Sequence, residues 1–208
     1  MPLTNDCSSM KPLMARRTVH DPREITRVAQ RLAGQGPVEA VTIAAIVRAS
    51  GAPAGSIYHR FDSREDLLAA AWLDAVTAFQ AVFLGALPAG PAATVAAVLK
   101  WAREAPDMAR LVVLRLPRDL HSTAWPPGRV AQAARLAAEL EAGLDGFCET
   151  HLGQRGGEAR RRVTFALLDL PHAALRRYLA AGIPPPPEVD AYVASAVRAL
   201  LTADPPPT

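Results

Sequence analysis

The sequence has few of the residues from which disulfide frameworks, metal sites and enzyme active sites are built. Only two of its 208 residues are cysteines, which is too few for a disulfide framework. His121, His151 and His172 are isolated by their spacing, so we expect neither a metal ion nor any other cofactor. The chain has no GxSxG motif and no glycine-rich phosphate loop after a strand. We therefore do not expect an enzyme.

Long hydrophobic runs are also scarce. No apolar run approaches the ~20 residues that a membrane span requires, and the N-terminus lacks the apolar core of a signal peptide. We therefore expect a cytoplasmic protein without a membrane partner. Hydrophobic residues make up 50% and charged residues 21% of the chain, as in ordinary globular proteins. Because no segment has a clear strand pattern, the predicted fold is all-α.

The positive charge is concentrated in the first third of the chain. Residues 1–64 contain nine Lys or Arg against five Asp or Glu, whereas residues 65–208 contain fourteen against fifteen. A positive surface is what binding to nucleic-acid phosphates requires. An excess of this size also occurs on ordinary solvated surfaces, so it supports a DNA-binding role only together with a motif.

Two short helices joined by a glycine turn are predicted within this positive segment. Thr42 can cap the first helix with its hydroxyl, and Gly51 permits the left-handed backbone that ends it. Pro53 suits the first turn of the second helix, which is expected to run from residue 54 to about residue 61. The positions at helical spacing that should face inward are Ile43, Ala44, Ile46, Val47, Ile57 and Phe61.

This arrangement matches the DNA-binding helix-turn-helix, although an αα-hairpin in some other helical domain has the same length and turn. Small residues at the start of the second helix favour DNA, because they let the helix approach a groove closely. Tyr58 and His59 are expected to face outward from that helix.

The segment GAPAGSIYHRF at residues 51–61, followed by SREDLL at residues 63–68, resembles the helix-turn-helix signature of the tetracycline-repressor (TetR) family of bacterial transcription regulators. The match extends upstream through Ile25, Ala29 and Gly36, and it covers about a quarter of the chain. The resemblance implies an all-α protein with a three-helix DNA-binding head, a larger helical ligand-binding and dimerisation domain, and about nine helices. It also implies a homodimer that binds a palindromic double-stranded DNA operator.

The resemblance assigns roles to individual residues. The positions that contact phosphates in the family correspond to Thr42, Ser56, Tyr58, His59 and Arg64, which carry suitable hydrogen-bond donors. The positions that face base edges correspond to Ala52, Ala54 and Gly55. The family commonly has a polar cap and a basic residue where this chain has Pro53 and Ala54, so no guanine contact is available there. Phosphate contacts and DNA shape are therefore expected to carry much of the affinity.

The chain divides into four parts on this interpretation. Residues 1–20 should form a flexible tail, residues 21–63 the helix-turn-helix domain, residues 64–203 the ligand-binding and dimerisation domain, and residues 204–208 a frayed end. The first helix should begin at Asp21-Pro22 and end at Gly34 and Gly36. A long helix, capped at Ser63 and continuing to Gly85, should connect head and body. The expected body helices cover residues 92–105, 106–116, 129–151, 158–181 with a bend at Pro171, and 188–201, with an irregular segment at 117–128.

The last two of these helices have broad apolar faces. One carries Val163, Leu167, Leu170 and Ala174, and the other carries Val189, Tyr192, Val193, Ala196, Val197 and Leu200. The resemblance implies that these helices pair with their copies in a second subunit as a four-helix bundle.

The resemblance also implies a pocket in the body for a small hydrophobic effector that releases the protein from DNA by shifting its conformational equilibrium. The large side chains that can form its wall are Trp72, Phe79, Phe83, Trp101, Met108, Trp125, Phe147 and Phe165. For each of them, packing in an ordinary core is the alternative. For the protein as a whole, the alternative is a helical protein-interaction domain without specific DNA binding.

Overall fold

The computed structural model describes residues 22–115 and 125–203, and all regular structure in these two ranges is helical. The ranges contain ten α-helical segments, two of which are joined into one continuous helix, in agreement with the predicted all-α fold. The expected tail, the Asp21 cap, most of the irregular segment including His121, and the frayed end lie outside the described residues.

Three helices form the head: α1 (Pro22–Gln35), α2 (Ile43–Ser50) and α3 (Ala54–Tyr58), with the short 3₁₀ turn η1 (Val38–Ala40) before α2. Their apolar faces meet in one cluster whose central side chains, Ile25, Ile46 and Ile57, are fully buried. The predicted caps of α2 are confirmed. Thr42 Oγ1 accepts a hydrogen bond from the backbone N–H of Ala45 at 3.1 Å, and Gly51 has the left-handed conformation with φ of +70°.

Two predictions about helix ends in the head are only partly right. Helix α1 ends at Gln35, directly before Gly36 as expected, but it continues through Gly34. This glycine is needed for packing, because a Cβ atom there would lie 3.0 Å from the carbonyl oxygen of Asp107 in the body. Helix α3 ends at Tyr58, and the N–H of Arg60 then bonds to Ile57 O, three residues back, in a tighter turn. Phe61 nevertheless packs in the head core, as its spacing from Ile57 predicted.

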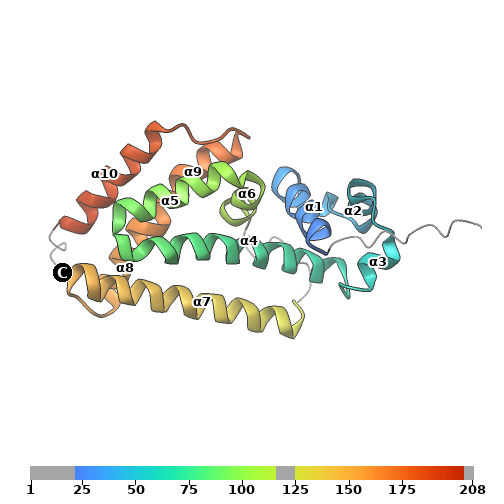
Figure 1. The fold of residues 1–208 in the computed structure, drawn as a ribbon, viewed down its shortest axis with the longest axis horizontal. Helices are drawn as coiled ribbons and strands as arrows, with labels where there is room; N and C mark the ends of the chain where they lie inside the picture. Colours follow the sequence, from blue (N-terminus) through green and yellow to red (C-terminus); the bar gives the residue numbers. More distant parts are fainter. Residues whose placement is uncertain (1–21, 116–124, 204–208) are drawn as a thin grey trace, which may run out of the picture.

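The helix that follows, α4 (Arg64–Ala86), runs along most of the length of the molecule from the head into the body (Figure 1). The hydroxyl of Ser63 caps it by accepting the N–H of Asp66 at 3.0 Å. Leu67, Leu68, Ala71 and Ala75 belong to the head core, whereas Phe79 and Phe83 belong to the body core. Because one helix of 23 residues contributes to both cores, the head and the body share a continuous support about 35 Å long.

Helix α4 is also apolar enough to cross a membrane by length and composition, although the absence of long apolar runs in the sequence suggested no such segment. More than half of its most apolar window is buried inside the protein, where α1, α5, α6 and α7 pack around it. The central helix of a globular core therefore accounts for this composition.

The body consists of α5 (Pro91–Glu104), α6 (Pro106–Leu114), α7 (Pro127–Phe147), α8 (Gly157–Thr164), α9 (Leu170–Ala180) and α10 (Glu188–Thr202). Helix α7 lies along one side of α4, and α5, α9 and α10 lie on the other (Figure 1). The predicted interruption near Pro171 is a π-helical turn, η5 (Phe165–Asp169), that joins α8 to α9. Pro171 itself lies in the first turn of α9, where a missing N–H is tolerated, so the irregularity precedes the proline.

Only part of the predicted apolar face of α10 is covered within one chain. Val189, Val193 and Val197 are buried on a helix that packs against α5. Tyr192, however, is 72% exposed, and Ala196 is exposed as well. Contact with α5 covers only a narrow stripe at a spacing of four residues, so the neighbouring positions stay outside it.

Candidate nucleic-acid interface and pockets

The second helix of the motif presents its expected residues to solvent. Tyr58 is 57% exposed, and His59, Ala54 and Gly55 are also exposed. These residues belong to α3 and its C-cap. The opposite face of α3 packs into the head core through the fully buried Ile57. The arrangement places small residues at the beginning of α3 and a phenol and an imidazole at its end, with nothing in the described chain covering them.

Thr42 and Ser56 have second roles inside the head. Thr42 Oγ1 is an acceptor in its helix cap, so its O–H remains available as a donor. The Ser56 hydroxyl receives a hydrogen bond from Arg60 Nη1, and the same nitrogen donates to the Ser56 carbonyl at 3.0 Å. Arg60 therefore lies back along α3, next to a residue that was assigned to phosphate binding.

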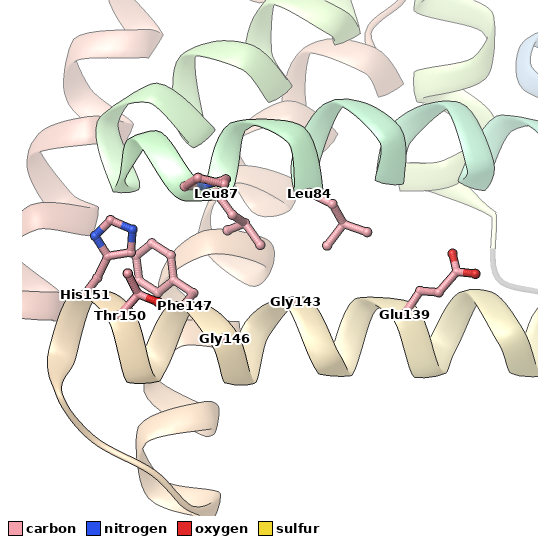
Figure 2. Close-up of a pocket in the computed structure, with 9 residues that line it drawn as sticks. Leu84, Leu87, Glu139, Gly143, Gly146, Phe147, Thr150 and His151 are labelled. Carbon is pink, nitrogen blue, oxygen red and sulfur yellow. The ribbon is translucent and has the colours of Figure 1, made fainter.

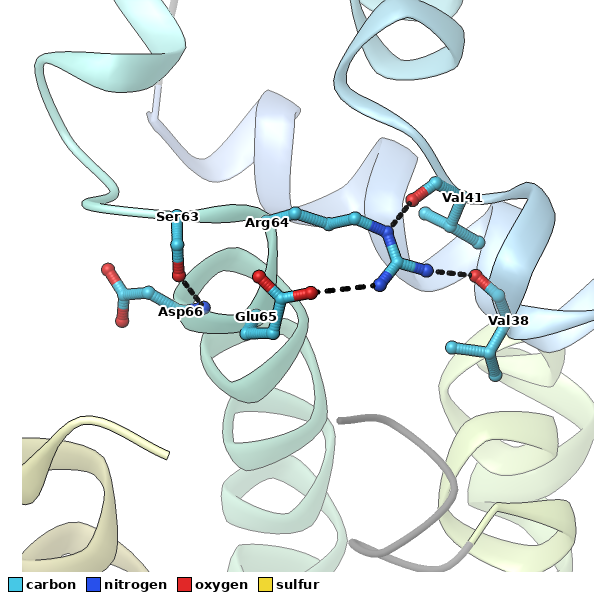
Figure 3. A network of polar contacts seen from close by, with 6 residues as sticks. All are labelled: Val38, Val41, Ser63, Arg64, Glu65 and Asp66. Carbon is cyan, nitrogen blue, oxygen red and sulfur yellow. Dashed lines mark hydrogen bonds and ion pairs between the residues drawn. The ribbon is translucent and has the colours of Figure 1, made fainter. Parts of the chain in front are cut away.

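Arg64, which the resemblance assigned to phosphate contact, is turned inward (Figure 3). Its Nε donates to Val41 O at 2.6 Å, its Nη2 donates to Val38 O, and its Nη1 is paired with Glu65 at 3.2 Å. Each nitrogen of the guanidinium thus makes one contact, with the carbonyls at the two ends of η1 and with a neighbouring carboxylate on α4. In this conformation Arg64 joins η1 to the start of α4, and three of its five N–H groups are engaged within the chain.

Ala52 is a clear correction. It was expected at a base edge, but its side chain is fully buried in the head core, and its N–H donates to Ser50 Oγ at 3.1 Å. A turn of this tightness packs one of its residues inward. Only the positions after Pro53 remain for contact with bases.

Two sets of contacts fix the head on the body. Arg115, at the end of α6, donates to Gly36 O at 2.6 Å and to Ala33 O at 3.3 Å, so it satisfies carbonyls at the end of α1. Gln30 is almost completely buried and donates to Ala71 O at 3.1 Å and to Asp74 Oδ2 at 2.8 Å. Helix α1 is therefore tied both to α6 and to α4.

A third tie comes from the beginning of α7. Arg129 Nε lies 2.7 Å from Asp66 Oδ1, and the two side chains are 28% and 10% exposed. The other oxygen of Asp66 accepts the N–H of Asp62, just after the helix-turn-helix. Close by, the rings of Trp72 and Trp125 lie 5.6 Å apart. The start of α7 is thus linked through one carboxylate to the end of the head.

The body contains two pockets along α4. The first, which we call the α4–α7 groove, has a volume of about 400 Å³ and lies between the ends of α4 and α7 (Figure 2). Its floor depends on a close helix contact, because a Cβ at Gly143 would lie 2.4 Å from Leu84 Cδ2. Glu139, Thr150 and His151 at its edge are exposed to solvent.

The second, which we call the Gln80 pocket, has a volume of about 490 Å³ and lies between α4, α6, α7 and α9. It is lined mainly by apolar side chains, among them Val76, Phe79 and Leu140. His172 is also on its wall, and burial lowers the pKa of this imidazole. Neutral histidine is therefore the favoured form at neutral pH.

The structure does not bring the eight expected wall residues together. Trp72 and Phe79 line the Gln80 pocket, and Phe147 lines the α4–α7 groove. Met108 lines a polar cleft between the head and the body. The expectation for the other four has no support among the described pockets: Phe83, Trp101 and Trp125 are buried in cores, and Phe165 is 53% exposed. Helical spacing alone could not distinguish residues that line a pocket from residues buried in a core, because neighbouring helices cover α4 on nearly every side.

Sequence reasoning missed the residues that hold the parts together. Arg129, Arg115 and Gln30 have partners at least 41 positions away in the chain, so no local pattern reveals them. Gln80 is different, since a polar residue between Phe79 and Phe83 interrupts an apolar stripe and was visible as an anomaly. No group of three His, Cys, Asp or Glu that could hold a metal ion occurs within residues 22–115 and 125–203.

Comparison with known proteins gives one match in sequence and several in fold. Residues 25–71 match the family model described as bacterial regulatory proteins, tetR family. No curated protein matches the chain. A tetR-family transcription regulator from Shewanella sp. PV-4 has a similar structure, with a TM-score of 0.65 and 19% identity over 89% of this chain and 96% of that one. The fatty acid degradation regulator FadR from Bacillus halodurans gives a TM-score of 0.66 and 14% identity over 88% and 99% of the two chains.

Proposed function

We propose that this protein is a ligand-responsive transcriptional repressor, because residues 25–71 match the model of the tetR family and the fold resembles that of such regulators. It binds a palindromic operator as a homodimer and is released by a small hydrophobic molecule. The observation that carries the DNA-binding part is the uncovered face of α3, with Tyr58 and His59 exposed at its end. We propose a cytoplasmic location and no catalytic activity.

The DNA-contacting residues in this proposal are those that the fold leaves at the surface. Thr42, Tyr58 and His59 are donors to phosphates, and Ala54 and Gly55 lie against base edges. Ser56 joins them only if DNA displaces the hydrogen bond from Arg60. Residues 21–63 would act as the reading unit, supported by the first half of α4.

The homodimer is supported by apolar surface that one chain leaves uncovered. Val163 and Leu167, expected at the subunit contact, are buried within the chain. Phe165 at 53% and Tyr192 at 72% are among its most exposed large hydrophobic residues, and they lie on η5 and α10, the same pair of helices. A two-fold dimer through these helices would place two heads on half-sites about 34–36 Å apart, or a multiple of it.

The test is to map the DNA upstream of the gene and its neighbours that the purified protein protects, and then to measure affinity for that site. We expect Tyr58→Phe, which removes only the hydroxyl, to weaken operator binding about fivefold, the effect of losing one hydrogen bond. Tyr178→Phe, a tyrosine of α9 in the body, is the matched control and should bind as the parent does. A protein-interaction domain would protect no specific site, and unchanged binding by Tyr58→Ala would refute the role of Tyr58.

A further inference from the structure

Two side chains in the wall of the Gln80 pocket carry buried polar atoms that have no partner among the described residues. Gln80 is only 5% exposed, yet its Oε1 has no hydrogen-bond partner among the described residues. The indole N–H of Trp72, also inaccessible to solvent, has none either. Both side chains line the pocket from α4. Buried polar groups are nearly always paired, so an unpaired acceptor and an unpaired donor on two residues of one pocket wall favour a partner that binds there and that a rotation of these side chains would reach.

The rest of the wall is apolar. Val76 and Phe79 on α4 face Leu136 and Leu140 on α7 across the space. A volume of about 490 Å³ falls within the range of sites for small organic molecules. The α4–α7 groove is a weaker candidate, because its polar side chains are exposed and already meet water.

His172 supplies a second acceptor. Its Nδ1 lies 2.9 Å from Leu168 O, and a carbonyl oxygen can only accept, so Nδ1 carries the proton. In the neutral ring, Nε2 is then an acceptor. The ring is held edge-on against Phe79, with 5.6 Å between the ring centroids, which fixes its orientation at the wall.

The described residues that line the pocket carry negative charge and no positive charge. Asp169 is the only charged residue among the described residues that line it, and none of them is Lys or Arg. A carboxylate or phosphate entering this space would lose its hydration without gaining a cationic partner and would meet a like charge.

We propose that the Gln80 pocket binds an uncharged, mainly apolar molecule through a hydrogen-bonding group held by the Gln80 carboxamide, and that it discriminates against carboxylates. The carboxamide can turn to offer either its oxygen or its NH₂ group, so hydroxyl and carboxamide compounds both fit. This inference rests on the proposed function, since the molecule would be the effector of the repressor, and it specifies the chemistry of that effector.

The test uses two probes of equal shape, 4-phenylbutanamide and 4-phenylbutanoate, titrated into the full-length protein. Trp72 is on the wall, so tryptophan fluorescence reports binding. The amide should bind at least about tenfold more tightly than the carboxylate. A tenfold difference is about 1.4 kcal/mol of binding free energy, which is less than the cost of leaving a buried charge unpaired. Gln80→Met, of similar size, should weaken amide binding about fivefold.

Asp169→Asn is a change at an exposed position. It should strengthen binding of the carboxylate and so reduce the difference in affinity between the two probes. Glu139→Gln in the α4–α7 groove is the matched control and should change neither affinity. Unfolding midpoints of all variants establish that they are folded.

Equal affinities for the two probes, no binding of either, or unchanged amide binding in folded Gln80→Met would overturn the inference. Operator binding is measured on the same samples. If the protein binds its operator but does not prefer the amide, this inference fails and the proposed function stands. If it prefers the amide but protects no DNA, the proposed function fails and the pocket chemistry stands.

Discussion

The polar groups of α4 that are tied to α1 and to the start of α7 differ from those that line the Gln80 pocket. Asp66 is paired with Arg129 of α7, and Asp74 and the carbonyl of Ala71 both accept hydrogen bonds from Gln30 of α1. In the wall of the Gln80 pocket, Trp72 Nε1 and Gln80 Oε1 have no partner among the described residues. One region of the helix is therefore closed by protein contacts, and the other borders a space and has unpaired hydrogen-bonding groups.

This difference fits the two tasks proposed for the chain. Reading DNA needs a head whose orientation is fixed, because each phosphate contact depends on register. Binding a small molecule needs a cavity with a few oriented polar groups. Since α4 belongs to both cores, and α6 and α7 are also tied to the head end, occupation of the Gln80 pocket can change the position of the head by moving any of these three helices.

The largest effect on stability should come from truncating one buried side chain in each of the two cores. Ile57→Ala in the head and Leu99→Ala in the body both remove a fully buried side chain, and each should lower the free energy of unfolding by about 2–5 kcal/mol. Only Ile57→Ala should also abolish specific operator binding under conditions where the protein remains folded, because Ile57 supports α3. Urea unfolding and operator titration measure the two quantities. Equal loss of operator affinity in both variants would mean that operator binding does not depend on the head core more than on the body core.

A smaller effect is expected from the tie between α7 and the head. A double-mutant cycle with Asp66→Asn and Arg129→Gln should give a coupling energy of roughly 1–2 kcal/mol, since the pair is partly shielded from water. The exposed pair Arg155–Glu149, with side chains 81% and 44% exposed, is the control and should give a coupling of less than about 0.5 kcal/mol. Similar coupling energies for the two pairs would mean that the contact between Asp66 and Arg129 does not hold α7 to the head more firmly than an exposed ion pair would.

The smallest effect concerns the pH dependence of stability through His172, which lines the Gln80 pocket. Burial lowers the pKa of His172 below its usual value of 6.5. Between the folded and the unfolded pKa, the unfolded chain binds more protons than the native one, so stability is full above about pH 6.5 and decreases as the pH falls. His172→Gln should therefore lose less stability than the parent between pH ~7.5 and ~5.5 when urea midpoints are compared. His151→Gln, at an exposed position, should behave as the parent, and an identical pH slope in His172→Gln would contradict the assignment.

Much of the head could be predicted because its signals are local. Thr42, Gly51 and Ser63 mark helix ends through hydrogen bonds and backbone angles that involve residues at most four positions away. Tyr58 and Ile57 follow from helical spacing alone. The family resemblance placed Ala52 and Arg64 at the DNA surface. Ala52 is instead fully buried, and Arg64 is partly buried and bonded to the carbonyls of Val38 and Val41, because their positions depend on what packs against the turn and on η1.

The sequence by itself determined the helical class of this protein, the turn between α2 and α3, and the presence of a long helix after Ser63. These features arise from short-range sterics and from the hydrogen-bonding capacity of neighbouring residues. Only the tertiary structure decided which side of each helix is covered. Contacts such as Arg129 with Asp66, or the space beside Gln80, join residues far apart in the chain, and they exist only once α4 and α7 lie side by side.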